Sequence, residues 1–318
     1  MTRHVPPAVC LGILVADVIA RPVKCLPAPG ALLPMPEIAL ATGGCAVNTG
    51  IAMARLGVPL RIVGKVGSDA FGEFVLSALR ADRIDVRGVR RDPKVQTSAT
   101  VVTVYPSGER GFLHCIGANA ALREKDVDWS VMKGAKHLHV AGTFVMPGID
   151  GKPTARILAK ARRLGLTTSL DTVWDPKDRW DEAWVCLPHL DYFMPSYEEA
   201  RRMTGETTPD RIAARCMEKG ARTVVLKMGE EGCYIRHAEG EIRVPAFVVP
   251  KVVDTTGAGD SFIGGFLTGL LMGWDLERCG RLGNATGAAC VQAMGASTGI
   301  GNLRQTVKLM RTLNVRAS

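Results

Sequence analysis

Apolar positions along the chain recur in two alternating patterns, which predict strands and helices in turn. Short apolar runs at residues 60–66, 136–141, 166–171 and 222–228 are typical of buried strands. Residues 69–82, 154–164, 209–218, 260–272 and 276–294 instead repeat apolar positions at helical spacing, as Phe71, Phe74 and Val75 do. Strands that alternate with helices in this way indicate parallel β-α-β units. We therefore expect an α/β fold around a mainly parallel sheet.

Two regions depart from this alternation and predict a β excursion from the α/β body. Residues 21–40 are rich in proline and lack a regular period. Residues 97–105 and 110–116 predict a hairpin, because Pro106-Ser107-Gly108-Glu109 between them has the composition of a turn. We expect the segments of about 18–40 and 95–118 to form a small β lid. Since no long linker interrupts the pattern, residues 1–318 are predicted to form one domain.

The composition indicates a folded protein and excludes several other classes. Of the 318 residues, 47% are apolar and 22% are charged, a balance that chains without a core do not have. No apolar run approaches the roughly 20 residues of a membrane span, and we expect no signal peptide and no membrane partner. The nine cysteines form no C-x-x-C pair, so we expect buried thiols in a reducing, cytoplasmic compartment.

The net charge raises the possibility of an anionic partner. It is +9, from 40 Lys+Arg and 31 Asp+Glu. A positive surface attracts nucleic acids and anionic small molecules alike. No run of five basic residues occurs, however, and aromatic residues make up only 5%, which is too few for a base-stacking surface. We expect no nucleic-acid partner.

The segment from Asp254 to Asp260 (DTTGAGD) carries the strongest chemical signal. An apolar run at residues 248–253 predicts a strand before it, and a helix is predicted to begin at about Gly259. Glycines let a backbone approach a ligand closely, and the first N–H groups of a helix attract anions. Asp260, in the first turn, is suited to take a proton from a hydroxyl that attacks a phosphate. Alternatively, Asp260 only caps the helix.

A second glycine pair precedes a helix near the N-terminus. Gly43 and Gly44 stand before a helix predicted over residues 49–56, and Asn48 offers both a donor and an acceptor to sugar hydroxyls. A third glycine-rich stretch, residues 64–72, fits a turn from strand to helix, with Asp69 as the N-cap. On their own, both stretches are also compatible with simple turns.

Other nucleotide-binding and catalytic motifs are missing from the sequence. The chain has no G-x-x-x-x-G-K-[ST] phosphate loop and no G-x-G-x-x-G after a strand. It also has no G-x-S-x-G nucleophile elbow. These absences exclude P-loop kinases, dinucleotide-dependent enzymes of the common type and α/β-hydrolases.

In their order and spacing, these segments resemble the two signatures of the ribokinase-like (PfkB) carbohydrate kinases. Residues 43–48 and 64–72 resemble the first signature, and residues 254–260 resemble the second. Residues 12–17 are similar to the family's opening strand, 117–122 to the segment after its lid hairpin, and 227–232 to its nucleotide-side loop. The resemblance spans most of the chain. It implies a three-layer α/β/α fold with a mainly parallel central sheet and a small β lid.

The resemblance also implies a reaction, its cofactors and a set of site residues. The reaction is transfer of the γ-phosphoryl group of ATP to a sugar hydroxyl, with Asp260 as the base and Mg²⁺ bridging phosphate oxygens. The expected anion hole comprises Gly257, Ala258 and Gly259. The expected sugar-binding residues are Asp17, Gly43, Gly44 and Asn48. The expected nucleotide site comprises Lys227, Gly229, Gly232, Asn284, Ser196 and Glu199, with Glu199 acting indirectly on Mg²⁺. A monovalent cation, typically K⁺, is expected near Asp254, Thr256 and the loop after Gly295.

The sequence departs from the family pattern at two places. Ser196 stands where members often have Asn, which puts the metal and phosphate geometry in doubt but not the reaction. Residues 171–176 contain no basic residue, whereas members acting on anionic sugars often carry one in this stretch, so a neutral sugar is favoured.

Alternatives to a sugar kinase are an adenosine-type nucleoside kinase and a non-catalytic sugar or nucleotide sensor. A vitamin kinase of the related superfamily is a third alternative, but the Gly43–Gly44 element argues against it. The free edges of the lid strands predict a homodimer through the lid.

Overall fold

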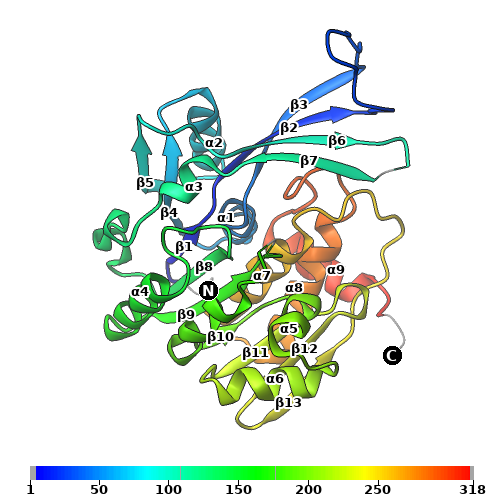
Figure 1. The fold of residues 1–318 in the computed structure, drawn as a ribbon. Helices are drawn as coiled ribbons and strands as arrows, with labels where there is room; N and C mark the ends of the chain where they lie inside the picture. Colours follow the sequence, from blue (N-terminus) through cyan, green and yellow to red (C-terminus); the bar gives the residue numbers. More distant parts are fainter. Residues whose placement is uncertain (1–4, 108, 176, 316–318) are drawn as a thin grey trace.

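The protein is built around two β-sheets of unequal size. The computed structural model describes residues 5–107, 109–175 and 177–315. Position 108, in the predicted turn, lies outside the described residues. The larger sheet has the strand order β13-β12-β11-β10-β9-β8-β1-β4-β5, and its neighbouring strands are parallel except at β12 and β13. The smaller sheet has the order β3-β2-β6-β7 and extends from one side of the body (Figure 1).

The strands of the large sheet are β1 (Ala8–Gly12), β4 (Leu60–Gly67), β5 (Asp85–Asp92), β8 (His137–Thr143), β9 (Thr167–Thr172), β10 (Tyr192–Phe193), β11 (Thr223–Lys227), β12 (Cys233–His237) and β13 (Gly240–Val244). Those of the small sheet are β2 (Val15–Arg21), β3 (Glu37–Gly43), β6 (Ala99–Val104) and β7 (Arg110–Cys115). The α-helices are α1 (Cys45–Arg55), α2 (Ala70–Ala81), α3 (Gly117–Ala121), α4 (Lys152–Arg163), α5 (Tyr197–Thr204), α6 (Pro209–Glu218), α7 (Ala258–Leu271), α8 (Leu276–Cys290) and α9 (Leu303–Thr312). Short 3-10 helices occupy Glu124–Asp126, Trp129–Met132, Trp180–His189 and Gly229–Glu231.

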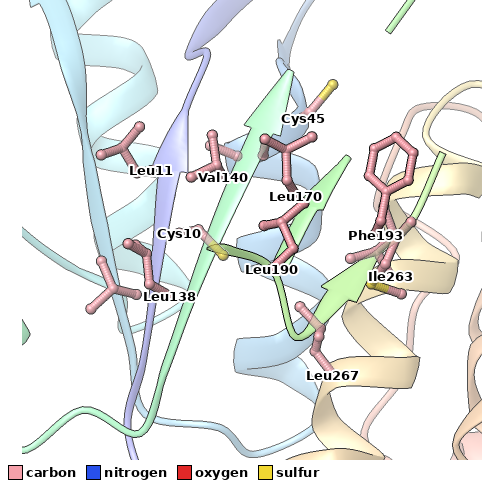
Figure 2. Close-up of a cluster of buried hydrophobic side chains, with 14 of the residues drawn as sticks. Cys10, Leu11, Cys45, Leu138, Val140, Leu170, Leu190, Phe193, Ile263 and Leu267 are labelled. Carbon is pink, nitrogen blue, oxygen red and sulfur yellow. The ribbon is translucent and has the colours of Figure 1, made fainter. Parts of the chain in front are cut away.

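Helices cover both faces of the large sheet, which makes three layers. Helix α7 packs against α1 and α8 in one layer, and α4, α5 and α6 lie in the other (Figure 1). The central strands β1 and β8 are buried along their whole length, as continuous apolar strand sequences require. Figure 2 shows part of the core, in which Cys10 and Leu138 of neighbouring strands belong to one buried cluster with Ile263 and Leu267 of α7. This architecture confirms the predicted α/β class, and no helix in the described ranges is long and apolar enough to cross a membrane.

The predicted opening strand over residues 12–17 is wrong in one respect, because the chain changes sheets within it. Strand β1 ends at Gly12 in the large sheet, and β2 begins at Val15 in the small one. The change is held by Asn119, whose side chain accepts a hydrogen bond from Leu14 N–H (3.1 Å) and donates one to Leu14 C=O (3.2 Å). A Cβ on Gly12 would lie 2.0 Å from Ala141 O, so only glycine fits at this point.

The predicted strand at residues 248–253 is also wrong. These residues form no strand, and Val248, Val252 and Val253 are at least 40% exposed. Their apolar side chains belong partly to the wall of a cavity, where Val249 and Val252 lie, and this accounts for an apolar run without strand pairing. Smaller differences affect element ends, since α1 begins at Cys45 instead of residue 49 and α8 ends at Cys290 instead of residue 294. Within residues 21–40, Arg21 is the last residue of β2, and the next strand begins only at Glu37.

Candidate active site

Asp260 lies in the first turn of α7, at the point where the glycine-rich segments 43–48 and 254–260 meet. The helix begins after Gly257, whose φ of 73° places it in the left-handed region. The Asn48 side-chain amide of α1 donates a hydrogen bond to Asp260 Oδ2 (2.8 Å), and Thr49 Oγ1 donates to the Asp260 carbonyl (3.2 Å). Segments 212 residues apart are thereby joined around one carboxylate. Desolvation raises the pKa of Asp260, while the hydrogen bond from Asn48 and the charge of Lys227 act in the opposite direction.

A buried group of ionisable side chains lies behind Asp260. The Cys45 sulfur and one carboxylate oxygen each of Asp171 and Asp260 all lie within 4.8 Å of one another. Lys227 Nζ lies 4.0 Å from Asp171 Oδ2. Burial raises the pKa of Asp171, and the lysine charge opposes that rise. Burial also raises the pKa of the Cys45 thiol well above its usual value, which disfavours a thiolate metal ligand. This cluster therefore suits proton sharing near Asp260 better than a metal centre.

A cavity of about 540 Å³ lies between Asp260 and the small sheet. Its polar lining includes Asp17, Gly44, Asn48, Thr100, Arg110, His114, Asp254, Thr256 and Asp260. Asp17 and Thr100 are paired across β2 and β6, and Thr100 is paired with His114 across β6 and β7. Burial raises the pKa of Asp17, and a hydrogen bond with Thr100 partly offsets this. The small sheet thus presents a polar row to the cavity.

Gly43 and Gly44 fit this wall because larger residues would collide with it. A Cβ on Gly43 would lie 2.1 Å from Asp17 Oδ2, and one on Gly44 would lie 2.5 Å from Ile13 O. Gly44 also has a φ of 92°, which L side chains rarely adopt. Gly43 therefore leaves the carboxylate of Asp17 free to face the cavity, and Gly44 lets the chain pass close to the backbone of Ile13.

A second cavity, of about 590 Å³, lies on the other side of the α7 N-terminus. It is lined by Lys227, Gly229, Glu230, Gly232, Ala246, Phe247, Val248, Val249, Val252, Thr255, Ala258, Gly259, Phe262, Asn284, Gly287, Ala288 and Val291. Asn284 donates hydrogen bonds to the carbonyls of Val244 and Pro245 (3.0 Å each), which fixes the loop opposite α8. Apolar walls suit a flat base, and the helix N-terminus suits phosphates, so these residues fit a nucleoside triphosphate.

The turn before α7 offers backbone donors at the boundary between the cavities. Among the described residues, the Gly257 and Gly259 N–H groups have no protein acceptor, whereas Ala258 N–H already donates to Thr255 O (3.2 Å). A Cβ on Gly257 would lie 2.5 Å from Ala296 O, so this position requires glycine. Of the three predicted anion-hole residues, Gly257 and Gly259 therefore have the more available donors.

Neither Ser196 nor Glu199 is among the described residues that line the two cavities. Glu199 lies near Asp260, which lines the first cavity. Ser196 and Glu199 form a capping box at the start of α5, in which Ser196 N–H donates to Glu199 Oε2 (3.0 Å) and Glu199 N–H donates to Ser196 Oγ (3.3 Å). Thr172 Oγ1, at the end of β9, also donates to Glu199 Oε2 (2.8 Å). Glu199 is near enough to Asp171 and Asp260 to raise the pKa of each. An indirect role for Glu199 near phosphate-bound Mg²⁺ fits this position.

The sequence analysis missed the side chains that the small sheet contributes. Arg110, Phe112 and His114 alternate along β7, and all three line the first cavity together with Asp17. Their two-residue spacing is visible in the sequence and could have placed them on one face of the predicted hairpin. Which face would lie over Asp260 depends on how the small sheet packs, and that was not visible in the pattern.

The three-layer architecture and the small sheet over the α7 N-terminus define a ribokinase-like α/β protein. The chain belongs to the pfkB family of carbohydrate kinases, whose family model matches residues 6–302. It is 31% identical to an uncharacterised sugar kinase of Archaeoglobus fulgidus, over 79% of this chain and 98% of that protein. It is 32% identical to 2-dehydro-3-deoxygluconokinase of Bacillus subtilis, over 81% of this chain and 82% of that protein.

Solved structures give the same fold. A ribokinase of Arabidopsis thaliana, in complex with ribose and ATP, superposes with a TM-score of 0.85 at 25% identity, covering 96% of this chain and 99% of that one. A ribokinase II candidate of Escherichia coli, in complex with ATP and Mg²⁺, superposes with a TM-score of 0.81 at 26% identity, again covering 96% and 99%. The predicted fold and family are confirmed, and the protein is a carbohydrate kinase.

Proposed function

We propose that the protein transfers the γ-phosphoryl group of ATP to a hydroxyl of a neutral sugar, with Asp260 as the base. The observation that carries this proposal is the meeting of two cavities at the first turn of α7. Asp260 lines one cavity, while Ala258 and Gly259 line the other. A sugar hydroxyl in the first cavity and a phosphate at the helix N-terminus would therefore approach each other beside the Asp260 carboxylate.

Residues of both cavities position the reacting groups and stabilise charge on the transferring phosphoryl group. ATP, when bound, supplies the phosphoryl group, and its Mg²⁺ neutralises charge on the phosphate oxygens. Asp17 and Asn48 hold sugar hydroxyls, and Asn48 also orients Asp260 through the 2.8 Å hydrogen bond. The Gly257 and Gly259 N–H groups stabilise negative charge on the transferring group, with Lys227 beside them. Asp260 accepts the proton of the attacking hydroxyl.

The charges around the first cavity favour a neutral substrate. Asp17, Asp254 and Asp260 line it together with one arginine, Arg110, which is already paired with Asp254 at 2.5 Å. Desolvation lowers the pKa of His114, so this ring adds no charge near neutral pH. A carboxylate or phosphate on the sugar would meet uncompensated acidic groups, whereas hydroxyls would find acceptors.

A nucleoside is the second candidate, because the cavity exceeds the needs of one sugar ring. Phe112 on β7 is 61% exposed and lies on the cavity wall with Ile19 and Val104. An exposed aromatic ring beside an apolar wall is suited to stack on a base. We favour the sugar because Phe112 is the one Phe, Tyr or Trp side chain in the described lining, and the other ring there, the imidazole of His114, comes from the same face of the same strand.

The small sheet is proposed to act as a lid that excludes water, which would otherwise compete as the phosphoryl acceptor. It supplies one wall of the first cavity, through residues such as Thr100 and Phe112. The end of β2 and the start of β3 lie within the predicted lid segment of about 18–40, whose residues 22–36 form no strand, and β6 and β7 lie within that of 95–118.

The test is a substrate panel with purified protein, Mg-ATP and ADP release as the readout. The panel contains neutral hexoses and pentoses, nucleosides, and 2-dehydro-3-deoxygluconate as the anionic arm. We expect the highest kcat/KM for a neutral sugar, with the phosphate position in the product determined by NMR. A nucleoside as the best substrate would replace the first candidate by the second. Preference for the sugar acid would contradict the charge argument, and absence of turnover with ATP bound would favour a sensor.

A further inference from the structure

Arg110, the first residue of β7, extends from the small sheet to the segment before α7. Its Nη2 lies 2.5 Å from Asp254 Oδ1 and 4.0 Å from Met294 Sδ, and its Nη1 donates to the Thr256 hydroxyl. The Arg110 side chain is 18% exposed, and that of Asp254 is 2% exposed. The ion pair thus joins two segments more than 140 residues apart within the wall of the substrate cavity.

Asp254 in turn organises the turn that carries the anion-binding N–H groups. Its Oδ1 accepts from Thr256 N–H and its Oδ2 accepts from Gly295 N–H, both at 2.8 Å. One carboxylate therefore ties the start of residues 254–260 to the loop at Gly295, against which Gly257 is packed. A carboxylate this deeply buried needs a counter-charge, since an unpaired one is strongly destabilising.

A monovalent cation was expected to supply that charge near Asp254 and Thr256. The residues present do not fit this expectation, because the guanidinium group already contacts Asp254 Oδ1 and the Thr256 hydroxyl, and the loop at Gly295 directs its N–H to Asp254 Oδ2. Asp254 Oδ1 carries two donors and Oδ2 carries one, so a second cation at this carboxylate would lie against Arg110. Two positive charges in contact with the same carboxylate repel each other strongly where water is excluded.

We propose that Arg110 is a positioning residue for phosphoryl transfer and takes the place of a monovalent cation beside Asp254. This inference rests on the proposed function. The anion-binding turn is then held in shape by the small sheet, and the enzyme does not depend on K⁺. Movement of the small sheet away from the body removes the counter-ion of Asp254, so the turn is fully ordered only when the cavity is covered.

The experiment compares wild type with Arg110→Ala, Arg110→Gln and Arg110→Lys, in tetramethylammonium buffer with and without K⁺. The matched control is Arg21→Ala, because Arg21 forms an exposed ion pair with Glu37 in the same sheet (2.6 Å). For wild type we expect less than about a twofold effect of K⁺ on kcat. Arg110→Ala and Arg110→Gln should lose about 10²-fold in kcat, the order expected when reacting groups are misplaced by about 1 Å. Arg110→Lys, K⁺ or added guanidinium should restore part of the loss, and Arg21→Ala should behave as wild type.

A second readout does not require turnover. Binding of Tl⁺, a K⁺ analogue observed directly by ²⁰⁵Tl NMR, should be undetectable in wild type and detectable in Arg110→Ala. Stoichiometric Tl⁺ binding to wild type, or a tenfold requirement for K⁺, would overturn the proposal. So would an Arg110→Ala variant whose only defect is a raised KM for an anionic substrate. If no substrate is phosphorylated at all, the proposed function is wrong. The Tl⁺ measurement still shows whether Arg110 takes the place of a monovalent cation.

Discussion

The Asp260 carboxylate is subject to opposing influences, and their balance determines what it can do. Desolvation raises its pKa, whereas the Asn48 hydrogen bond and the Lys227 charge stabilise its ionised form. A base near a helix N-terminus must be ionised at working pH but still attract a proton in the transition state. A carboxyl whose pKa lies above its ordinary value meets both requirements better than an exposed aspartate.

Replacement of this carboxylate is the first prediction at the residue scale. Asp260→Asn preserves shape but removes the proton acceptor, so kcat should fall by about 10²–10⁴-fold, the usual contribution of a general base. ATP affinity, measured by calorimetry, should stay within about threefold of wild type. Turnover close to that of wild type would show that another group accepts the proton.

The pH dependence of the reaction gives the second prediction. Because the ionised form of Asp260 is active, kcat/KM for the sugar should fall on the acid side, with an apparent pKa above the ordinary aspartate value. Asn48→Ala removes a hydrogen bond that lowers the pKa of Asp260, so the acid limb should move to higher pH. The measurement is a pH profile of kcat/KM for wild type and variant. An acid limb that stays in place would mean that Asn48 does not tune the base.

At the scale of elements, the strand β3 and the helix α1 meet at a pair of glycines, and the first of them offers a sharp test. In Gly43→Ala, the new Cβ would lie 2.1 Å from Asp17 Oδ2 and would push this carboxylate out of the cavity wall. The KM for the sugar should rise at least about tenfold, since one charge-assisted hydrogen bond contributes roughly 1.5–3 kcal/mol. The KM for ATP serves as the internal control and should change little. Equal rises in both would place Asp17 outside the sugar site.

Elements with strong local signals were predictable from the sequence, and those shaped by tertiary contacts were not. Helix α6 was predicted to its ends, because Pro209 suits a first turn and its apolar face is regular. The strand expected at residues 248–253 does not form, because its valines partly line a cavity instead of pairing with a neighbour. The division of residues 8–21 into β1 and β2 depends on Asn119, about 100 residues away, and no local pattern reports such a contact.

In the candidate site, too, residues with a local sequence signal were predictable and those brought together by tertiary contacts were not. Glycines beside helix starts mark Gly43, Gly44, Gly257 and Gly259 in the sequence, because close approach of a backbone restricts the residue type. The contribution of β7 was missed, because alternation in a hairpin shows which residues share a face but not what that face covers. Asp171 was passed over as a site residue for a similar reason, since its proximity to Lys227 arises only when β9 and β11 are assembled in one sheet.

At the scale of the whole molecule, the two faces of the small sheet differ in an unusual way. The inner face carries the polar row of Asp17, Thr100 and His114. On the outer face, Val18 is paired with Leu40 and with Val101, and Val101 with Leu113, which makes an apolar row across the sheet. Leu40, Val101 and Leu113 are 44%, 40% and 62% exposed. Exposed apolar surface of this kind marks an interaction site, and the sheet also has free edges.

We predict that a second copy of the chain covers this outer face, which gives a homodimer through the small sheet. Val101→Glu and Leu113→Glu place charges in the middle and at the edge of the apolar row, so each should shift the protein from dimer to monomer at micromolar concentration. Sedimentation velocity measures the change. The matched control is Leu164→Glu, because Leu164 is 56% exposed beside α4, far from the small sheet in the fold (Figure 1). A monomeric wild type, or a dimer that survives both substitutions, would contradict the prediction. Because the same sheet carries Arg110, a monomeric variant should also bind sugar more weakly, as its cavity wall is less firmly held.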